Sequence, residues 1–404
     1  MKNVPEIRFS GFTDDWEQRK LSDLCSLFTD GDWIEAKDQS TEGVRLVQTG
    51  NVGVTQYLDK TNNAKWISED TFSRLKCEEI FEGDILISRL PDPAGRACIM
   101  PNLGTKMITA VDCTIVRTLP DVNSEYLVQY LSTERYFKEI NACLAGGTRQ
   151  RVSRGNLAEF DIPLPNSADE QRAIGNYFKS LDHLITLHQR KLDKLKQFKA
   201  AMLDKMFPKE GANVPEIRFA GFTGDWEQRE LGDVFVEYSE KGHDELPPLT
   251  IIQGKGTILR EESERNLIYD KSGLKNYKLV NQDDFILHLR SFEGGLEKAN
   301  SQGIVSPAYH IFHGENADTR FYYPFFRSKY FISVLLKPHV YGIRDGKSID
   351  VEGMKTIDIP YPTIEEQNKI GDYFARLDSL ITLHQRKLDK LKQFKSAMLD
   401  KMFI

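Results

Sequence analysis

The chain has 404 residues, of which 40% are hydrophobic and 28% are charged. This composition is typical of a folded protein with more than one core, and it excludes a disordered chain. The net charge of −6 argues against a free-standing nucleic-acid binder, whose domain is usually basic, although an acidic total can hide a basic face.

The cysteines and the apolar runs indicate the cellular compartment of the protein. All five cysteines lie in the first half of the chain, in no CxxC spacing, and an odd set of this kind predicts reduced thiols. The start, MKNVPEIRF, lacks an apolar export signal, and no run of 18 apolar residues occurs. We therefore expect a cytoplasmic protein without a membrane span.

Two stretches of the chain occur twice. Val4–Leu24 is nearly copied by Val214–Val234, and Leu181–Phe207 differs from Leu377–Phe403 at only 2 of 27 positions. Between these copies the two halves barely resemble each other. The chain is therefore interpreted as two half-molecules in tandem, in which the repeated stretches form a scaffold and the variable regions differ in what they recognise.

The variable regions mix strands and helices. Short apolar runs in 43–54 and 83–88 are bounded by Gly, Asn and Asp and predict strands and turns. Apolar residues fall at helical spacing over Ser124–Leu144 and over the aromatic-rich Thr319–Leu336. The aromatic run could be a base-stacking platform, but its spacing favours a packed helix face.

Each variable region ends in a short strand and a long helix. In FDIPLPNSADEQ and IDIPYPTIEEQ, Ser167 and Thr363 are placed as N-caps, with Glu170 and Glu366 at the third helical position. Each helix is therefore predicted to begin with a capping box. About 40 residues follow, which gives a helix of about 60 Å if it is continuous.

The repeated part of this helix has an apolar seam with alternating three- and four-residue spacing, which needs a partner helix. Because the two copies are nearly identical, we expect an antiparallel, pseudo-two-fold pair; the alternative is that each helix packs on its own domain. His188 and His384 are interpreted as register-setting residues rather than metal ligands. Gly175 and Gly371 are expected to bend or break the helices near their starts. The predicted helix-pairing residues are Leu181, Ile185, His188, Leu192, Leu195, Met202, Leu377, Ile381, His384, Leu388, Leu391 and Met398.

Two basic, glycine-led loops precede the closing strands at matching places: GGTRQRVSR over Gly146–Arg154 and YGIRDGKS over Tyr341–Ser348. Their cations could pair with phosphates or present a planar fork to guanine. A solvated surface turn is the alternative for either loop alone, but their equivalent positions favour a binding loop. The candidate DNA-binding residues are Arg89, Gly147, Arg149, Gln150, Arg151, Ser153, Arg154, Arg290, Tyr341, Arg344 and Lys347.

Three weaker motifs point to chemistry that the sequence does not support. In YGIRDGKS only three residues separate the glycines where a P-loop needs four, so a nucleotide-using enzyme is disfavoured. His310 and His313 lack the accompanying ligand cluster of a zinc site. DIPLP and DIPYP lack the second proline and the aromatic residue of a DPPY methyltransferase motif. No catalytic, metal-binding or cofactor-binding residue is therefore assigned.

Over its whole length the chain resembles a type I restriction-modification specificity subunit. The resemblance lies in the two variable regions, each preceded by a DWEQR block and followed by a helix ending LITLHQRKLDKLKQFKxAMLDKMF. The stretches GDILISRLPDPAGRACIMP (83–101) and GIVSPAYHIF (303–312) also resemble motifs of such target recognition domains. The resemblance implies a non-catalytic subunit for host defence against foreign DNA, in which each variable domain reads one half of a bipartite, asymmetric double-stranded DNA sequence.

The resemblance further implies the partners. The helices would set the spacing between the half-sites and dock two methyltransferase subunits, and restriction and translocase subunits would join them. S-adenosylmethionine, ATP and Mg²⁺ would belong to these partners and not to this chain. A tandem protein-binding scaffold without DNA readout is the alternative function.

The expected fold class is α+β, with two mixed α/β target recognition domains separated by two long helices that form an antiparallel coiled coil. The expected domains are a first target recognition domain at 1–160, a first long helix and linker at 161–213, a second target recognition domain at 214–358, and a second long helix at 359–404.

Overall fold

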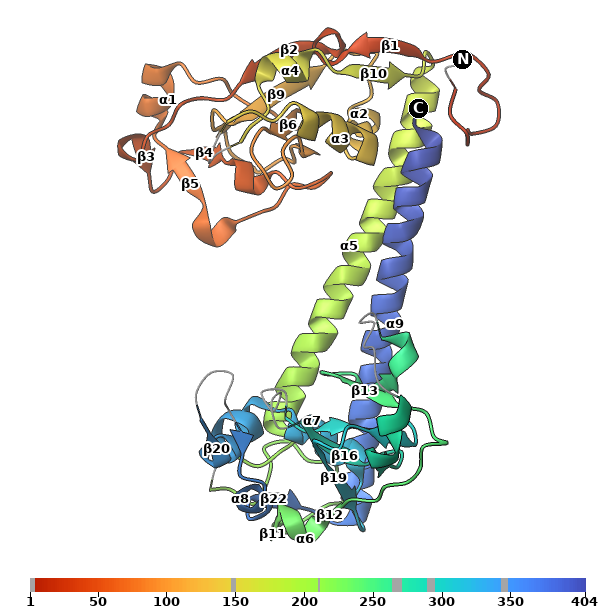
Figure 1. The fold of residues 1–404 in the computed structure, drawn as a ribbon. Helices are drawn as coiled ribbons and strands as arrows, with labels where there is room; N and C mark the ends of the chain where they lie inside the picture. Colours follow the sequence, from red (N-terminus) through yellow and green to blue (C-terminus); the bar gives the residue numbers. More distant parts are fainter. Residues whose placement is uncertain (1–3, 147–149, 210, 264–270, 289–294, 343–347) are drawn as a thin grey trace. The chain divides into compact units, whose positions relative to one another are not determined.

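The chain folds into two compact units. The computed structural model describes residues 4–146, 150–209, 211–263, 271–288, 295–342 and 348–404. The first unit consists of residues 1–189 and 386–404, and the second of residues 190–385 (Figure 1). Each unit thus holds one variable region together with part of both long helices, a different division from the predicted domains, whose boundaries stay a prediction. Within the described residues, no helix is long and apolar enough to cross a membrane.

The first unit begins with the repeated N-terminal stretch. Its strands are β1 (Glu17–Lys20), β2 (Cys25–Asp30), β3 (Gln39–Ser40), β4 (Val44–Val47), β5 (Lys65–Ile67), β6 (Ile85–Ser88), β7 (Ala97–Ile99), β8 (Met107–Thr109), β9 (Cys113–Thr118) and β10 (Asp161–Leu164). Its helices are η1 (Leu21–Leu24), η2 (Ala36–Asp38), η3 (Thr49–Asn51), η4 (Thr61–Asn63), α1 (Glu69–Leu75), α2 (Ser124–Tyr130), α3 (Glu134–Ala142), α4 (Arg154–Ala158) and the start of α5 (Ala168–Lys205).

Two sheets form the body of this unit. One has the order β2-β9-β6-β7 and is antiparallel, and the other has the order β3-β5-β4-β8, with a parallel β4–β8 pair. Alternate residues of β6 enter two different cores, because Ile85 and Ile87 join one apolar cluster and Leu86 joins another. A strand that is buried on both faces explains the uninterrupted apolar run ILI in this part of the sequence.

The second unit repeats this plan with different details. Its strands are β11 (Glu227–Glu230), β12 (Phe235–Tyr238), β13 (Leu249–Ile252), β14 (Gly256–Leu259), β15 (Lys278–Val280), β16 (Phe285–His288), β17 (Glu297–Lys298), β18 (Gly303–Val305), β19 (Tyr309–Gly314), β20 (Val340–Tyr341), β21 (Ser348–Ile349) and β22 (Asp358–Tyr361). Its helices are α6 (Leu231–Val234), η5 (Arg260–Glu262), η6 (Lys271–Asn276), α7 (Thr319–Phe326), η8 (Phe331–Leu336), η9 (Lys337–His339), α8 (Val351–Lys355) and the start of α9 (Ile364–Met402).

The equivalence of the two units is visible in their strand pairing. The sheet β12-β19-β16-β17 of the second unit has the same order as β2-β9-β6-β7 of the first. In both units the repeated N-terminal stretch pairs antiparallel with the closing strand: Glu17 lies opposite Leu164 and Glu227 lies opposite Tyr361. The repeated stretch therefore clamps the two ends of each variable region together.

The predicted helices within the variable regions are each divided. Ser124–Leu144 contains two helices, α2 and α3, and Thr319–Leu336 contains α7 followed by the π-helical η8. The aromatic side chains of α7, including Phe321, Tyr322 and Phe326, are buried in the core. The packed helix face is therefore confirmed, and a base-stacking platform at this place is wrong.

The long helices α5 and α9 run through Gly175 and Gly371 without interruption, so a break at these glycines is wrong, and a bend stays a prediction. These glycines permit close packing instead. A Cβ atom at Gly175 would lie 2.8 Å from the backbone nitrogen of Tyr126 in α2, and one at Gly371 would lie 3.0 Å from Cβ of Arg320 in α7. The shorter helices can therefore approach the long ones only where a side chain is absent.

The predicted capping boxes form only in part. Ser167 Oγ accepts from the backbone nitrogen of Glu170 at 3.4 Å, as a cap does. The Glu170 carboxylate, however, accepts from the guanidinium of Arg8, at 2.6 and 2.8 Å, and Glu366 in the second unit pairs with Arg218 in the same way, at 2.7 Å for each oxygen. Each glutamate thus fastens the repeated N-terminal stretch to the first turn of a long helix.

The far end of each long helix completes a core. Phe403 follows α9 and lies in the first unit's core, 5.8 Å from Phe178 between ring centroids. Phe207 follows α5 and lies in the second unit's core, 5.3 Å from Phe325. Each variable region therefore packs against the start of its own long helix and the end of the other one.

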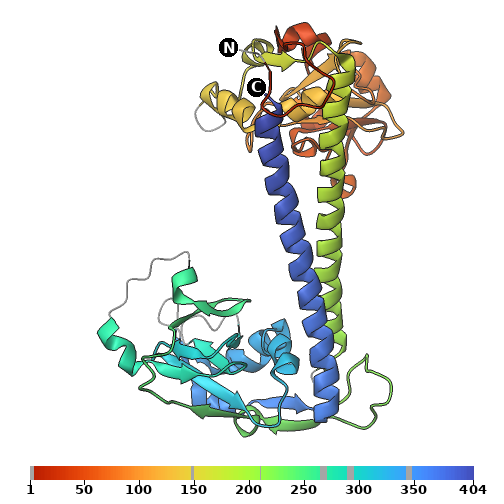
Figure 2. The ribbon, with the colours of Figure 1, turned by 90° about the vertical axis from the view of Figure 1, so that its right-hand side faces the viewer.

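Within each unit the two long helices run side by side and antiparallel (Figures 1 and 2). Lys395 Nζ of α9 lies 2.6 Å from Asp182 of α5 in the first unit, and Lys199 Nζ of α5 lies 2.5 Å from Asp378 of α9 in the second. All the predicted helix-pairing residues are buried or half-buried, and Leu192 and Leu388 are almost completely covered. The fold class is confirmed, including two mixed α/β domains in tandem.

The two equivalent ion pairs differ in burial. Only 12% of the Lys395 side chain and 16% of the Asp182 side chain are exposed, against 25% and 47% for Lys199 and Asp378. Burial lowers the pKa of Lys395. Asp182 also accepts from Thr55 Oγ1 at 3.0 Å and from Gln129 Nε2 at 2.8 Å. This carboxylate therefore joins both helices to the first variable region.

Replacing Asp182 with Ala should lower the free energy of unfolding of the first unit by about 3–5 kcal/mol, because it leaves a buried ammonium unpaired. The equivalent Asp378→Ala change should cost about 0–1 kcal/mol, because that pair is largely exposed. Denaturant unfolding of both variants measures the difference. Equal losses would show that burial does not set the strength of these pairs.

Candidate nucleic-acid interface

The closing loop of the first unit is held against the end of β6. Arg151 and Ala145 exchange backbone hydrogen bonds of 2.9 and 3.1 Å, and the backbone nitrogen of Val152 donates to the carbonyl of Arg89 at 3.2 Å. Gln150 is exposed. Gly147 and Arg149, which the sequence also proposes as DNA-binding residues, lie outside the described residues.

Two carboxylates form ion pairs with the described arginines of this region. Asp30, at the end of β2, lies 3.4 Å from Arg89 and 3.9 Å from Arg154, and Asp112 lies 3.5 Å from Arg151. Neither aspartate is singled out by a sequence motif. The arginines that are far apart in the sequence therefore form one cluster, which we call the arginine cluster: Arg89, Arg151 and Arg154.

The members of the arginine cluster differ in accessibility. Arg89 is buried and donates from Nη2 to the carbonyl of Val111 at 2.7 Å. Arg151 and Arg154 are exposed, and their ion pairs with the aspartates are long, so these pairs stabilise little and leave the guanidinium groups available to a ligand. Arg89 thus positions the loop, and Arg151 and Arg154 face solvent.

Ser153, another proposed DNA-binding residue, has a local structural role. Its Oγ accepts from the backbone nitrogen of Asn156 at 3.0 Å and so caps α4. Asp350 caps α8 of the second unit in the same manner. In both units the closing loop is therefore followed by a capped five-residue helix and then by the closing strand, β10 or β22.

The second closing loop is described only in part. Tyr341, in β20, is exposed, and β20 pairs with β21 on the other side of the loop. Arg290, Arg344 and Lys347, which the sequence proposes as DNA-binding residues, lie outside the described residues. Their proposed roles stay predictions.

The polar groups of the second unit's main sheet differ from those of the first. His310 Nδ1 lies 2.6 Å from Glu237, and His313 Nδ1 lies 2.7 Å from the buried Asp284. Lys355 also pairs with Glu237, at 2.7 Å. Each histidine is therefore bound to a single carboxylate, and among the described residues no three His, Cys, Asp or Glu side chains are grouped to hold a metal ion.

Arg96 organises the loops beside the arginine cluster, a role that the sequence did not indicate. Its guanidinium is buried and donates to the carbonyls of Thr49 and Val52 on one loop, at 2.9 and 2.6 Å, and to those of Leu90 and Pro93 on another, at 2.7 and 2.8 Å. Burial lowers its pKa. One side chain therefore fixes two loops, and one of them directly follows Arg89.

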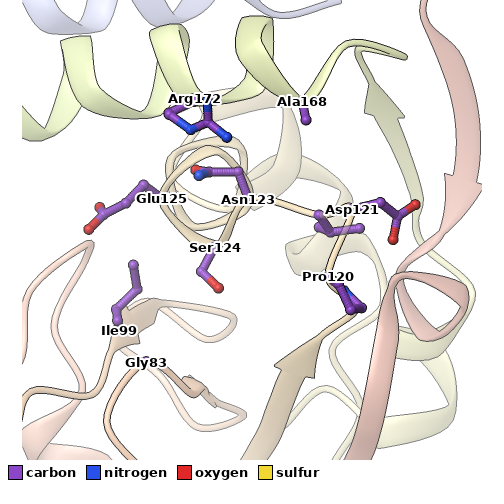
Figure 3. A pocket seen from close by; sticks show the side chains of 10 residues that line it. Gly83, Ile99, Pro120, Asp121, Asn123, Ser124, Glu125, Ala168 and Arg172 are labelled. Carbon is purple, nitrogen blue, oxygen red and sulfur yellow. The ribbon is translucent and has the colours of Figure 1, made fainter.

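A polar pocket of about 320 Å³ lies elsewhere in the first unit, between the beginnings of α2 and α5 (Figure 3). Its side chains already have structural partners. Asn123 caps α2 by accepting from the backbone nitrogen of Tyr126 at 2.9 Å, and Arg172 pairs with Asp169 at 2.6 Å. The pocket therefore offers no free catalytic or binding group.

The fold and these surfaces define a protein of two equivalent domains with different surface loops on a shared helical scaffold. The family model of the type I restriction modification DNA specificity domain matches the chain twice, at residues 13–197 and 223–393. The chain belongs to this family. It is a specificity subunit, the non-catalytic component of a restriction-modification system that recognises the DNA target.

Relatives match over nearly the full length. A putative type I restriction enzyme MjaX specificity subunit of Methanocaldococcus jannaschii is 21% identical over 99% of this chain and 95% of its own. The MjaVIII specificity subunit of the same organism is 25% identical over 99% and 94%. The crystal structure of the type I S subunit from M. genitalium has a TM-score of 0.65 at 15% identity and covers 99% of both chains, which supports the fold.

Replacing both Arg151 and Arg154 with Ala should weaken DNA binding by about 1–3 kcal/mol for each base-reading arginine, because their guanidinium groups face solvent in the arginine cluster. A phosphate contact would instead lower the slope of log K against log salt by about 1 for each arginine. Binding titrations at several salt concentrations separate the two. Arg135→Ala, an exposed arginine on α3, is the control and should change neither quantity.

If the double variant has the same DNA affinity and the same slope of log K against log salt as the original protein, the two arginines do not contact DNA. The loop is then a solvated surface turn. Thermal unfolding should be unaffected in either case, because substitutions of exposed residues usually change stability by less than about 0.5 kcal/mol.

Proposed function

We propose that the chain selects a bipartite, asymmetric double-stranded DNA target, with each unit reading one half-site. The observation that carries this proposal is the equivalence of the two closing loops. Both lie between the variable region and the closing strand, and both are followed by a capped five-residue helix. The scaffold around the loops is repeated, but their residues differ, as expected if each loop meets a different sequence.

The arginine cluster supports DNA as the ligand of the first unit. Arg151 and Arg154 present planar guanidinium forks, which match phosphate oxygens or the acceptor edge of guanine. Asp112 lies 3.5 Å from Arg151 and Asp30 lies 3.9 Å from Arg154, and these long ion pairs leave both guanidinium groups available to a ligand. The net charge of −6 fits this role if partner subunits supply part of the positive surface that faces DNA.

We further propose that two methyltransferase subunits dock on the repeated helices. Leu184 and Leu187 of α5 and Phe394 of α9 are exposed by 43–48% in the first unit. Their counterparts Leu380, Leu383 and Phe198 are exposed by 44–46% in the second. We call these six residues the exposed apolar sites.

The exposed apolar sites lie outside the buried seam between the helices, and six large apolar side chains kept in water at matching positions indicate a protein interface. Because the same residues occur in both units, one partner surface can bind twice. The solved type I system that resembles this chain with a TM-score of 0.53 is described in terms of complex assembly. S-adenosylmethionine, ATP and Mg²⁺ would then be bound by the partners, and restriction and translocase subunits would join the same assembly. The role of the helices in setting the spacing between half-sites stays a prediction.

Exchanging residues 24–160 for the same region of a relative should change one half of the recognised sequence and leave the other half unaltered. The reason is that the repeated strands and helices hold each variable region in the same way. Mapping methylated adenines genome-wide, with the exchanged and the original gene, reads out both halves. A change in both halves would contradict independent reading, and a methylation pattern that does not depend on this gene would favour the protein-binding scaffold.

Replacing Leu187 and Leu383 with Glu should prevent the methyltransferase subunits from co-purifying with this chain, because a charge would be buried in an apolar interface. Thermal stability should be unchanged, since both residues are exposed. Leu58→Glu, at an equally exposed leucine of the first variable region, is the matched control. Undiminished co-purification of the double variant would exclude these positions from the interface.

A further inference from the structure

Trp33 is the most exposed of the large apolar side chains that the structure describes, at 71%. It follows β2 directly, in the loop 31–35 that leads to η2. Trp16 and Trp226 are buried, and Trp66 is half-buried under the guanidinium of Arg45. No sequence motif singles Trp33 out, and the fold does not need it as a core residue.

The backbone that carries Trp33 is firmly held. Gly31 donates to the carbonyl of Cys113 and Asp32 donates to the carbonyl of Thr109, each at 2.9 Å. A Cβ atom at Gly31 would lie 2.4 Å from the carbonyl oxygen of Thr109, so only glycine permits this approach. The Asp32 carboxylate also accepts from the backbone nitrogen of Glu78 at 3.0 Å. The exposed indole is therefore presented from a fixed position.

This position adjoins the arginine cluster. The backbone nitrogen of Val111 donates to the carbonyl of Asp32 at 2.9 Å, and the carbonyl of Val111 accepts from Arg89 at 2.7 Å. The next residue, Asp112, pairs with Arg151. A single short turn, 110–112, therefore joins the loop of Trp33 on one side and the arginines on the other.

The indole of Trp33 is largely exposed, and the carboxylate of the nearby residue Glu35 is paired with Lys37 at 2.8 Å. The negative charge of Glu35 is therefore compensated by a cation. An aromatic face next to solvent-facing arginines is the combination that contacts bases beside phosphates in nucleic-acid interfaces.

We propose that Trp33 makes an apolar contact with the bases of the half-site that the first unit reads, beside the ionic contacts of the arginine cluster. This inference rests on the proposed function, and it adds a residue to the reading surface. The contact is apolar, so its contribution to affinity does not depend on salt, whereas that of an arginine on a phosphate does.

The test uses the full chain assembled with its methyltransferase subunits and a DNA duplex that carries the recognised sequence. Trp33→Ala should weaken binding about tenfold, the usual effect of removing one base-stacking side chain, with the slope of log K against log salt unchanged. Trp33→Phe should retain most of the affinity, because it keeps an aromatic face. Arg151→Ala, in contrast, should lower the slope if it contacts a phosphate.

Phe81→Ala is the matched control. Phe81 is exposed by 49% but lies before the first residue of β6, while Arg89 follows its last, so it is at the opposite end of that strand from the arginine cluster. Its removal should not change DNA affinity. A decrease equal to that of Trp33→Ala would show a general effect of surface aromatic residues and would overturn the proposal.

Tryptophan fluorescence gives a readout that does not depend on the stability of a variant. DNA should quench the emission of the original complex, and the Trp33→Phe complex should lose that quenching while still binding. Equal quenching in both complexes, or specific binding by Trp33→Ala at full affinity, would overturn the inference and leave the proposed function standing. If the original complex binds no specific sequence, the proposed function fails and this inference fails with it.

Discussion

The structure depends on the aromatic residue that follows each long helix, because this residue packs in a core that the other half of the chain builds. Phe403 packs with Trp16, Tyr126 and Phe178, and Phe207 packs with Trp226, Phe321 and Phe325. Backbone hydrogen bonds join the same helix ends to the repeated N-terminal stretches. Ile7 donates to the carbonyl of Lys401 and Ile217 donates to that of Lys205, each at 2.9 Å. Neither variable region has a complete core without the end of the long helix that begins in the other half of the chain.

This constraint accounts for what is repeated and what is not. The residues that fasten a variable region occur in both copies: the strand that pairs with the closing strand, the arginine that binds the first-turn glutamate, the seam and the final phenylalanine. The Arg8–Glu170 and Arg218–Glu366 pairs have the same form, because the guanidinium binds both carboxylate oxygens in each case. The loops outside these attachments differ between the units, and some add contacts of their own to the helices, as Thr55 does to Asp182 in the first unit.

The architecture could be predicted well from the sequence, because the repeated stretches and the helical spacing of apolar residues indicate which residues pack together. The seam, the closing strands and the buried aromatic face of α7 all follow from the periodicity of apolar residues. Its failures concern contacts between residues that are far apart. Gly175 is a helix breaker by local propensity, but tertiary packing against α2 requires the missing side chain. Glu170 has the spacing of a capping box, yet Arg8, 162 residues earlier, binds its carboxylate more strongly than a backbone amide would.

The candidate site was predictable only in outline. Both glycine-led loops were proposed from their matching places in the sequence, but the partners of the first loop could not be predicted. Asp30 and Asp112 stand in no motif, and the burial of Arg89 follows from its place at the end of a strand that is covered on both faces. Trp33 was missed for a similar reason, because a lone tryptophan in a sequence indicates a core residue more often than a presented one.

The two units hold different chemistry on the same strand framework. At the end of β2 the first unit has an aspartate that gathers arginines, while on the equivalent β12 the second unit has Glu237, which binds His310 and Lys355. A carboxylate therefore organises basic side chains in both, but these side chains differ in shape and in number of donors. Arginine offers a rigid fork, and histidine and lysine offer single donors with other geometries. Two units with the same order of strands in their main sheets and unlike polar surfaces are suited to unlike ligands, which agrees with the proposal that each unit reads a different half-site.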